Sequence, residues 1–384
     1  MSDKMRWYYA SCSLGFEDLL AAEVNEAGGT RVREDRGGVS FQGTLEVGYR
    51  LCLWSRVGIR VFEELARRRI QNADDIYRLA GTVDWQAVMG SDQTFAVFGD
   101  SSSRMVRNAS FAALRVKDAV ADQLRETTGT RPDVDRDDPD VALKLVVKGR
   151  VATIARDLAG TSLHRRGWRP IQVKSPLNEA LAAGLLLRTG WDRQSPLCDP
   201  MCGSGTFLVE AAHLASDRAP GLERTFGFER WPDVDTALLE TLRAEALRRW
   251  TAGRDAVPPL LGNDLHAGAL TIARESAKRA GVDRYIQFEN RPLTAFQPDP
   301  TPSVVVVNPP YGVRIGAEGD LPMTWRQLGN WLKDVGQGEG WVLSGDPELT
   351  GNLRLKANQR YPVQNGGIDC RWLRYPLRKR QPLA

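Results

Sequence analysis

We predict a mixed α/β fold in which an open, mostly parallel sheet fills the second half of the chain and a smaller α+β region precedes it. Three observations support this prediction. From residue 177 onward, short apolar segments alternate with helical ones, as in βαβ units. Four consecutive valines at 304–307 indicate a strand buried on both faces, which is typical of parallel sheets. The length of 384 residues suits two or three domains.

Composition argues against several classes of protein. Hydrophobic residues at 42% and charged residues at 26% fit an ordinary globular protein. No apolar run approaches the ~20 residues that cross a membrane, and the first residues lack the apolar core of a signal peptide, so we expect a cytoplasmic protein without membrane contact. The five cysteines form no CxxC motif and the three histidines are scattered, so we expect neither a disulfide framework nor a metal. The sequence does not give the oligomeric state, and we favour a monomer.

The first 165 residues mix strands and helices. The period of the apolar residues predicts, in order, strand 6–12, helix 15–28, strand 37–43, helix 44–57, strand 60–70, strand 94–100, helix 107–129, and strands 141–150 and 151–160. The last two strands read as a hairpin that turns at Gly149. The polar, basic segment 161–176 is interpreted as a linker.

In the remaining residues, segments with the helical spacing of apolar residues alternate with segments that have the spacing of strands. The predicted elements are helix 177–190, strand 196–200, helix 205–217, strand 258–264, helix 267–281, strand 285–290, strand 303–310, helix 324–336 and strand 340–346. The segment between Asp199 and Asp264 is far longer than the ~20 residues of a simple dinucleotide fold. We expect it to add helices beside the active site, and we expect its aromatic residues Phe226, Phe228 and Trp231 to belong to a core rather than to a substrate wall.

The first candidate loop, 199–206 (DPMCGSGT), follows a short strand and leads into a helix at the edge where open α/β sheets bind ligands. Gly203 and Gly205 allow a tight turn and a close approach of a ligand to the backbone, and the N–H groups at the start of the helix favour a carboxylate or phosphate. The loop lacks the third glycine of a dinucleotide fingerprint and the Lys-Ser/Thr of a P-loop. An ordinary glycine-rich turn is the alternative.

The second candidate loop places Asp264 between an apolar strand and a helix. A carboxylate in this position can accept both hydroxyl hydrogens of a ribose. Aspartate is also a common N-cap residue, so a structural role at the start of the next helix is equally open.

The third candidate loop, Asn308-Pro309-Pro310-Tyr311, is the most specific signal in the sequence. The prolines fix φ and donate no backbone hydrogen bond. The Asn308 side chain and the Pro309 backbone each offer a carbonyl oxygen, and two aimed acceptors suit the two hydrogens of an exocyclic amine. Tyr311 offers a flat face on which a base can stack. The alternative is that this segment only ends the strand rigidly.

Two stretches are rich in lysine and arginine, residues 141–169 and 371–380. Clusters of this kind suit a polyanion, although a solvated surface is the simpler interpretation of either stretch alone.

These motifs resemble a known family. Asp-Pro-Met-Cys-Gly-Ser-Gly-Thr at 199–206, followed by Asn-Pro-Pro-Tyr-Gly at 308–312, resembles S-adenosylmethionine-dependent methyltransferases that modify amino groups. The segments LHRRGWR, LNEALAAGLLLRTGW, APGLERTFGFERW and NGGIDCRW are similar to those of the guanine-N2 methyltransferases of bacterial 23S ribosomal RNA, which carry an N-terminal THUMP domain. The resemblance covers most of 160–375 and is weaker over 1–160. The enterobacterial relative has a second methyltransferase domain, which we expect this chain to lack.

The resemblance implies three domains, a cofactor and a substrate. Residues 1–60 would form a ferredoxin-like α+β subdomain, residues 61–165 a THUMP RNA-binding domain, and residues 166–384 a Rossmann-like methyltransferase domain. The cofactor would be S-adenosyl-L-methionine, and the substrate would be a guanine in RNA, with 23S ribosomal RNA preferred.

The resemblance also assigns roles to matching residues. The catalytic residues, which hold the target amine and its base, would be Asn308, Pro309, Pro310 and Tyr311. The cofactor-binding residues would be Asp199, Pro200, Met201, Gly203, Ser204, Gly205, Thr206, Asn263, Asp264, Leu265, Asn290 and Asn308. The chain departs from the family where many relatives have an aspartate that contacts the adenine amine, because Pro292 stands there. Asn290 or a backbone group would replace it. The RNA-binding residues would be Arg104, Arg107, Arg115, Lys117, Arg165, Arg166 and Arg169.

Other functions fit the same loops. A tRNA guanine-N2 methyltransferase would share the layout. Adenine-N6 or cytosine-N4 DNA methyltransferases and protein glutamine methyltransferases also use Asn-Pro-Pro-Tyr, but the THUMP-like N-terminal half favours RNA. A non-catalytic RNA-binding protein is disfavoured because all three loops keep their functional residues.

Overall fold

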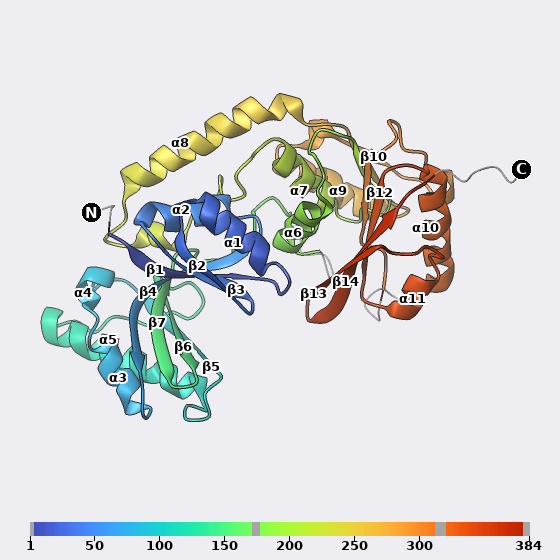
Figure 1. Cartoon of the computed structure of the whole chain (residues 1–384). Helices are drawn as coiled ribbons and strands as arrows, with labels where there is room; N and C mark the ends of the chain where they lie inside the picture. The colour runs from blue at the N-terminus through green and yellow to red at the C-terminus, as the bar shows by residue number, and fades with distance from the viewer. Residues whose placement is uncertain (1–3, 171–176, 312–319, 379–384) are drawn as a thin grey trace, which may run out of the picture. The chain divides into compact units, whose positions relative to one another are not determined.

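The computed structural model describes residues 4–170, 177–311 and 320–378 (Figure 1). The chain divides into two compact units. The first unit contains Met1–Cys12, Leu20–Leu163 and Arg224–Arg243, and the second contains Ser13–Leu19, His164–Glu223 and Ala244–Ala384. The crossing between Leu163 and His164 lies next to the boundary that we predicted at 165.

The elements of the N-terminal part follow the predicted order closely. They are β1 (Arg6–Cys12), α1 (Glu17–Glu26), β2 (Thr30–Asp35), β3 (Gly38–Gly43), α2 (Leu45–Trp54), β4 (Gly58–Arg69), α3 (Asp74–Ala80), α4 (Trp85–Val88), β5 (Phe95–Ser101), α5 (Ala109–Thr128), β6 (Val141–Lys148) and β7 (Val151–Asp157). Helix α5 begins where the Asn108 side chain accepts the Phe111 N–H at 2.9 Å, and it ends at Gly129, whose φ of +75° few other residues adopt. The predicted hairpin is confirmed as β6–β7, with φ +57° at Gly149.

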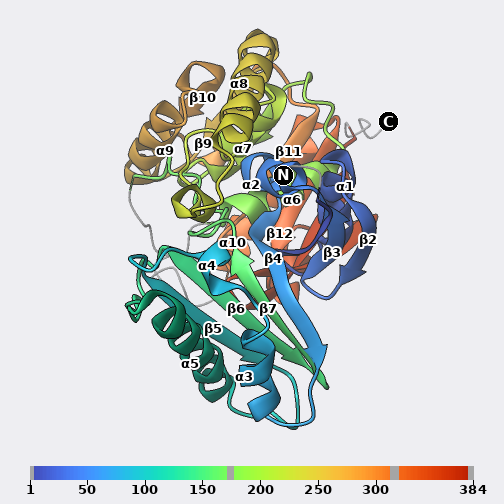
Figure 2. The same ribbon diagram turned by 90° about the vertical axis from the view of Figure 1, so that its left-hand side faces the viewer.

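The first unit contains one seven-stranded sheet in the order β2-β3-β1-β4-β7-β6-β5. Only β5 and β6 pair in parallel, and the other neighbours are antiparallel. Helices α3 and α5 lie side by side, with α5 against β5 and α3 in contact with β4 (Figure 2).

Residues 224–243 of the long insertion belong to the first unit. That the insertion adds helices beside the active site stays a prediction. The Phe228 ring stacks on Tyr49 at 3.9 Å between centroids, and Gly160 packs against Gly227. Phe226, Phe228 and Trp231 are all buried, so their assignment to a core is confirmed. Helix α8 (Thr236–Gly253) then carries the chain back into the second unit.

The second unit is built from alternating helices and strands. They are α6 (Glu179–Thr189), β8 (Leu197–Asp199), α7 (Thr206–Ala215), β9 (Leu260–Asn263), α9 (Ala267–Arg279), β10 (Ile286–Glu289), β11 (Val304–Val307), α10 (Leu321–Val335), β12 (Glu339–Ser344), α11 (Pro347–Gly351), β13 (Gln359–Asn365) and β14 (Ile368–Pro376). The sheet order is β10-β9-β8-β11-β12-β14-β13. The first five strands in this order are parallel, and β14 is antiparallel to both of its neighbours.

The buried valine strand is confirmed. Val304–Val307 are at most 6% exposed. Val305 and Val307 belong to a core that includes Trp325 and Trp331 of α10, so this helix covers one face of the sheet. Asp320 caps α10 by accepting the Met323 N–H at 3.0 Å. Among the residues the structure describes, no helix is long and apolar enough to span a membrane.

Candidate active site

The three candidate loops lie at one edge of the second sheet. Asp199 pairs in register with Gly262 of β9, and Cys198 pairs with Val305 of β11. The carboxyl ends of β8, β9 and β11 therefore meet at this edge. The chain order runs outward from β8 through β9 to β10 on one side and from β11 to β12 on the other. A reversal of this kind is where open α/β sheets bind ligands.

The two glycines of the first loop differ in their surroundings. Gly203 has φ +53°, and a β-carbon placed on it would find nothing within 4 Å, so the backbone here borders open space. Gly205 has φ +77°, and a β-carbon there would lie 3.2 Å from the Ala273 side chain, so this glycine lets the loop approach α9 closely. Gly203 thus suits contact with a ligand, and Gly205 suits packing. Pro200 and Met201 connect Asp199 to the glycine turn, and Ser204 Oγ lies 3.4 Å from Thr206 Oγ1.

Asp199 is a buried carboxylate with few hydrogen bonds to compensate for its loss of contact with water. It is 2% exposed, and its Oδ1 accepts one N–H, from Met201 at 3.2 Å. Burial raises the pKa of Asp199 well above its usual range, and the nearby negative charge of Asp264 adds to the rise. A positively charged ligand group beside Asp199 would relieve both effects.

Asp264 connects the second loop to the first. Its Oδ2 accepts the Gly203 N–H at 2.9 Å, and its Oδ1 accepts the N–H of His266, the N-cap residue of α9, at 2.9 Å. Each carboxylate oxygen can accept a second hydrogen bond. Asp264 is therefore not the N-cap that the sequence left open, because His266 takes that position, but its carboxylate joins the two loops and leaves acceptors for a ribose.

Two asparagines in the predicted cofactor set bind the backbone of these loops. Asn263 Nδ2 donates to the carbonyls of Pro200 and Arg291 at 3.1 and 3.2 Å. Asn290 Nδ2 donates to the carbonyls of Asp264 and Leu265 at 2.8 and 2.9 Å. These side chains set the shape of the loops. Leu265, 62% exposed, presents an apolar surface beside them.

The third loop contains a buried polar atom without a hydrogen-bond partner among the described residues. Asn308 directly follows β11, and its Oδ1 is buried without a hydrogen-bond partner among the described residues. Buried acceptors are nearly always paired in native proteins, and exceptions mark catalytic or otherwise strained positions. The Asn308 amide oxygen can therefore accept a hydrogen bond that the described residues do not supply.

The rest of this loop is held by residues that sequence reasoning missed. Trp325 Nε1 of α10 donates to the Pro310 carbonyl at 2.8 Å. The Tyr311 hydroxyl accepts from Asn365 Nδ2 at 2.8 Å, and Cys370 Sγ lies 3.7 Å from it. Asn365 and Cys370 stand in the segment NGGIDCRW, which was noticed only for its resemblance to the family.

The predicted RNA-binding residues of the first unit lie in and just before α5. Arg104 and Arg107 are exposed and form no ion pair within the part of the chain that the structure describes. Arg115 pairs with Asp74 at 3.3 Å, and Lys117 pairs with Asp118 at 2.8 Å. Arg104 and Arg107 are thus the cations of this group that best suit a phosphate.

Two RNA assignments in the second unit are corrected, and residues 171–176 of the predicted linker lie outside the described residues. Arg165 is exposed, but Arg166 is 5% exposed and its Nε lies 3.6 Å from Glu210 Oε1. Arg169 is largely buried, and its Nη2 donates to Thr206 Oγ1 at 3.1 Å, which supports the glycine loop. A run of charges in a sequence does not reveal burial, so Arg166 was wrongly taken for a surface cation. Lys379 and Arg380 of the second basic stretch lie outside the described residues.

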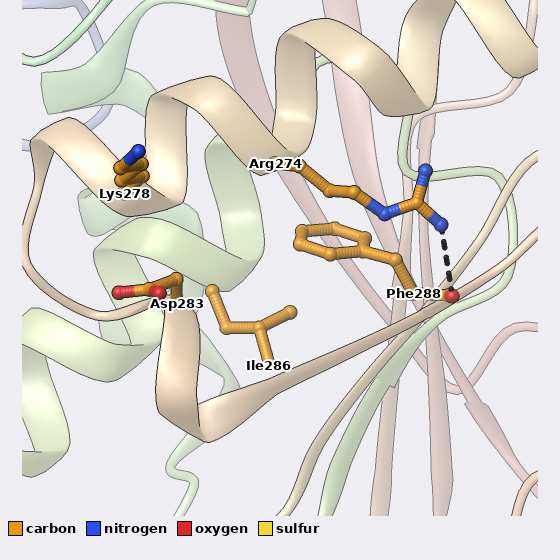
Figure 3. A pocket seen from close by; sticks show the side chains of 5 residues that line it. All are labelled: Arg274, Lys278, Asp283, Ile286 and Phe288. Atoms are coloured by element: carbon orange, nitrogen blue, oxygen red, sulfur yellow. Dashed lines mark hydrogen bonds between the residues drawn. The ribbon is translucent and has the colours of Figure 1, made fainter.

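A hollow of about 300 Å³ opens between α9 and β10, and its lining residues are Arg274, Lys278, Asp283, Ile286 and Phe288 (Figure 3). Arg274 Nη2 donates to the Phe288 carbonyl at 3.2 Å, as the figure shows. None of these residues belongs to the three candidate loops, but Phe288 lies close to the first of them, because a β-carbon on Gly205 would lie 3.5 Å from its Cζ.

Comparison with known families identifies three matching regions. Residues 166–374 match the model of an RMKL-like methyltransferase domain, residues 71–157 that of a THUMP domain, and residues 8–62 that of an RlmL ferredoxin-like domain. The predicted fold class and the order of the three parts are confirmed. The boundaries at 60 and 165 stay predictions.

Individual relatives are similar over nearly the whole chain. The ribosomal RNA large subunit methyltransferase K/L of Syntrophotalea carbinolica is 40% identical over 382 residues, which are 96% of this chain and 53% of the relative. The protein of the same name from Allochromatium vinosum is 40% identical over 99% of this chain and 52% of its own length. The chain thus spans about half the length of these relatives. A solved structure of a possible methylase from Clostridium difficile 630 superposes with a TM-score of 0.88 at 26% identity, covering 99% of this chain and all of the other.

Proposed function

This chain belongs to the family of RMKL-like methyltransferase domains, and we propose that it transfers a methyl group from S-adenosylmethionine to the exocyclic N2 amine of a guanine in 23S ribosomal RNA. The THUMP match and the names of its relatives support an RNA substrate of the large ribosomal subunit. The observation that carries the proposal is the buried Asn308 amide oxygen, which lacks a donor among the described residues at the ligand-binding edge of the sheet. The proposed substrate is found in the bacterial cytoplasm, so we propose that compartment, and a monomer, for the active protein.

The first two loops fit the cofactor. The Asp199 carboxylate, whose pKa is raised by burial, suits the ammonium group of the methionine part. The open backbone at Gly203 suits close contact with the same part, and the free lone pairs of Asp264 suit the ribose hydroxyls. When bound, S-adenosylmethionine supplies a methyl group that the sulfonium has already activated, so the protein acts mainly by positioning.

The third loop fits the acceptor. An exocyclic amine shares its lone pair with the ring and is a poor nucleophile until its nitrogen becomes pyramidal. Asn308 Oδ1 and the Pro309 carbonyl would accept its two hydrogens and hold the lone pair toward the methyl group. These hydrogen bonds strengthen as positive charge develops on the nitrogen, so they stabilise the transition state more than the ground state. No separate general base is needed during the attack.

The substrate must present one base to this loop. A guanine in a helix would have to leave its stack, and the Tyr311 ring would receive it. The cations of the first unit, including Arg104 and Arg107, would hold the RNA backbone, because folded RNA is recognised largely through phosphates and shape.

Mass spectrometry of nucleosides tests the proposal. The purified full chain would be incubated with S-adenosylmethionine and either unmodified 23S ribosomal RNA or unmodified tRNA, and both RNAs would then be digested. We expect N2-methylguanosine in the ribosomal RNA only. N2-methylguanosine in tRNA alone would favour the tRNA alternative. A methylated adenine, or no product from a protein that binds S-adenosylhomocysteine, would contradict guanine-N2 transfer.

A further inference from the structure

We infer that Asn365 and Trp325 are positioning residues that hold the Asn308–Tyr311 turn from two sides and thereby set where the acceptor base lies. This inference rests on the proposed function, because it takes Tyr311 as the residue on which the base stacks. It assigns a role to α10 and to the β13–β14 hairpin that neither the motifs nor the relatives supply.

The turn cannot fix its own orientation through its two central residues. Pro309 and Pro310 have no N–H and donate no hydrogen bond. Apart from the N–H groups of Asn308 and Tyr311 at its ends, the turn can therefore be held only through its carbonyl groups and side chains. The Asn308 and Pro309 oxygens cannot serve this purpose if they are to face the substrate, which leaves the Pro310 carbonyl and the Tyr311 side chain.

Trp325 holds the Pro310 carbonyl. Its side chain is fully buried in α10, and its Nε1 donates to the Pro310 carbonyl at 2.8 Å. This bond fixes the direction of the peptide between Pro310 and Tyr311. It also engages one lone pair of the Pro310 carbonyl, and we take the Pro309 carbonyl as the backbone acceptor of the turn for an amine.

Asn365 holds the far end of the Tyr311 ring. Its Nδ2 donates to the Tyr311 hydroxyl at 2.8 Å from the end of β13, and Cys370 Sγ of β14 lies 3.7 Å from the same hydroxyl. A β-carbon on Gly345 would lie 3.0 Å from Tyr311 Cδ2 and Cε2, so the loop after β12 also confines the ring. The plane on which the base would stack is thus fixed at the hydroxyl and along one edge.

The chain offers a matched control for each bond. Trp331 is another buried tryptophan of α10, and its Nε1 donates to the Phe296 carbonyl at 2.8 Å, outside the turn. Gln364 is the residue before Asn365, and its Nε2 donates to Asp369 Oδ1 at 3.1 Å across the same hairpin. Loss of either bond would affect stability without touching the turn.

A double-mutant cycle tests the inference on the Tyr311 side. Asn365→Ala and Tyr311→Phe remove opposite partners of one bond, and each should lower kcat on unmodified 23S ribosomal RNA about tenfold, within the range of small misplacements of a reacting group. The double variant should be no slower than either single variant, because the bond is already lost. Binding of S-adenosylhomocysteine should change less than twofold, and Gln364→Ala should keep the wild-type kcat.

The tryptophan pair tests the other side of the turn. Trp325→Phe should lower kcat more than Trp331→Phe does, even where both variants lose the same amount of thermal stability, and neither should weaken S-adenosylhomocysteine binding. Equal effects of the two tryptophans would overturn the role of Trp325.

The outcomes separate this inference from the proposed function. If the wild-type protein methylates guanine N2 but the Tyr311–Asn365 effects are additive, or Asn365→Ala has the wild-type kcat, the inference is wrong and the proposed function stands. If the wild-type protein methylates no RNA, both are wrong. If Tyr311→Phe is far slower than Asn365→Ala, other contacts of the hydroxyl, such as that with Cys370, matter more than the Asn365 bond and the positioning role of Asn365 is overturned.

Discussion

Asp264 on the cofactor side and Asn308 on the acceptor side of the sheet edge differ in how far the protein itself supplies their hydrogen-bond partners. Both oxygens of Asp264 accept backbone N–H groups, at 2.9 Å each, and these bonds tie its loop to the glycine turn. The amide oxygen of Asn308, on the other side of β8, is buried with no donor among the described residues. The Asp264 carboxylate is therefore paired without a ligand, and the Asn308 amide oxygen is not.

This difference implies that mutations of Asp264 and of Asn308 should affect the stability of the folded state differently. A buried acceptor without a partner costs about 1–3 kcal/mol, whereas a hydrogen bond to a charged group contributes about 1.5–3 kcal/mol. Removal of the Asp264 carboxylate should therefore weaken the folded state as well as cofactor binding. Removal of the Asn308 amide should leave the folded state at least as stable and affect only the reaction.

The largest effect is expected for Asn308→Ala. Loss of this aimed acceptor should slow single-turnover methyl transfer by about 10²-fold or more, as for a lost group of an oxyanion hole. The melting temperature and the affinity for S-adenosylhomocysteine should stay at wild-type values. Asn352→Ala serves as the control, because Asn352 only bonds its own helix, at the Glu348 carbonyl. A variant that loses stability or keeps full turnover would break the comparison.

Asp264→Ala should have the next largest effect. The variant loses two backbone hydrogen bonds to a charged acceptor, so its melting temperature should fall. Its affinity for S-adenosylhomocysteine, measured by calorimetry, should fall about tenfold or more, since 1.4 kcal/mol corresponds to a factor of ten. Asp283→Ala, at an exposed carboxylate outside the loops, is the control. Unchanged stability in Asp264→Ala would show that the cofactor side is not self-supporting.

Asp199→Asn should sharpen the comparison, because its effect on thermal stability should depend on pH. Burial raises the pKa of Asp199, so the folded state binds this proton more tightly than the unfolded chain does. The stability that this proton contributes is present below the unfolded pKa and is lost as pH rises through the folded pKa. Asparagine mimics the protonated form, so the variant should melt higher than the wild type at pH 8, with a smaller difference at pH 5.

Cofactor affinity should change with pH in the opposite direction to the stability that the Asp199 proton contributes. The ammonium of the cofactor requires the carboxylate form of Asp199, so wild-type affinity for S-adenosylhomocysteine should rise with pH through the raised pKa. Asp199→Asn should bind more weakly and lose this dependence. An affinity in the variant equal to that of the wild type at pH 8 would remove Asp199 from the cofactor site.

The smallest effect is expected at the surface of the first unit. Arg107→Ala should weaken RNA binding a few-fold and lower the dependence of the affinity on salt by about one unit of slope, as expected for one lost phosphate contact. Arg125→Ala is the control, since Arg125 is ion-paired with Asp122 at 3.4 Å. Arg166→Ala should instead lower the melting temperature, because its guanidinium is buried beside Glu210. Equal losses of RNA affinity in Arg107→Ala and Arg125→Ala would exclude a specific phosphate contact at Arg107.

The sequence predicted those parts of the fold that local periodicity determines. The strand at 6–12 and the buried valines at 304–307 were predicted from their apolar patterns alone, as was α5. Strand β2 was not predicted, because its sequence, TRVRED, is almost wholly polar and its residues are mostly exposed. The return of residues 224–243 to the first unit depends on contacts such as Phe228 on Tyr49, which no local pattern encodes.

The same limit applies to the candidate site. The residues at the ends of the strands were predictable, because the order of a parallel sheet brings those ends together. The partners of the third loop were not, because Trp325 and Asn365 reach it from elements that begin well after it in the sequence. Arg166 was misjudged for a related reason, since only the folded chain shows that it faces Glu210.

A crystal structure of the full chain soaked with S-adenosylmethionine tests the central claim most directly. The account predicts that the sulfonium methyl points to the corner formed by Asn308 Oδ1 and the Pro309 carbonyl, with the cofactor ribose on Asp264. A methyl group that points away from this corner, or a corner filled by the protein's own side chains, would contradict it.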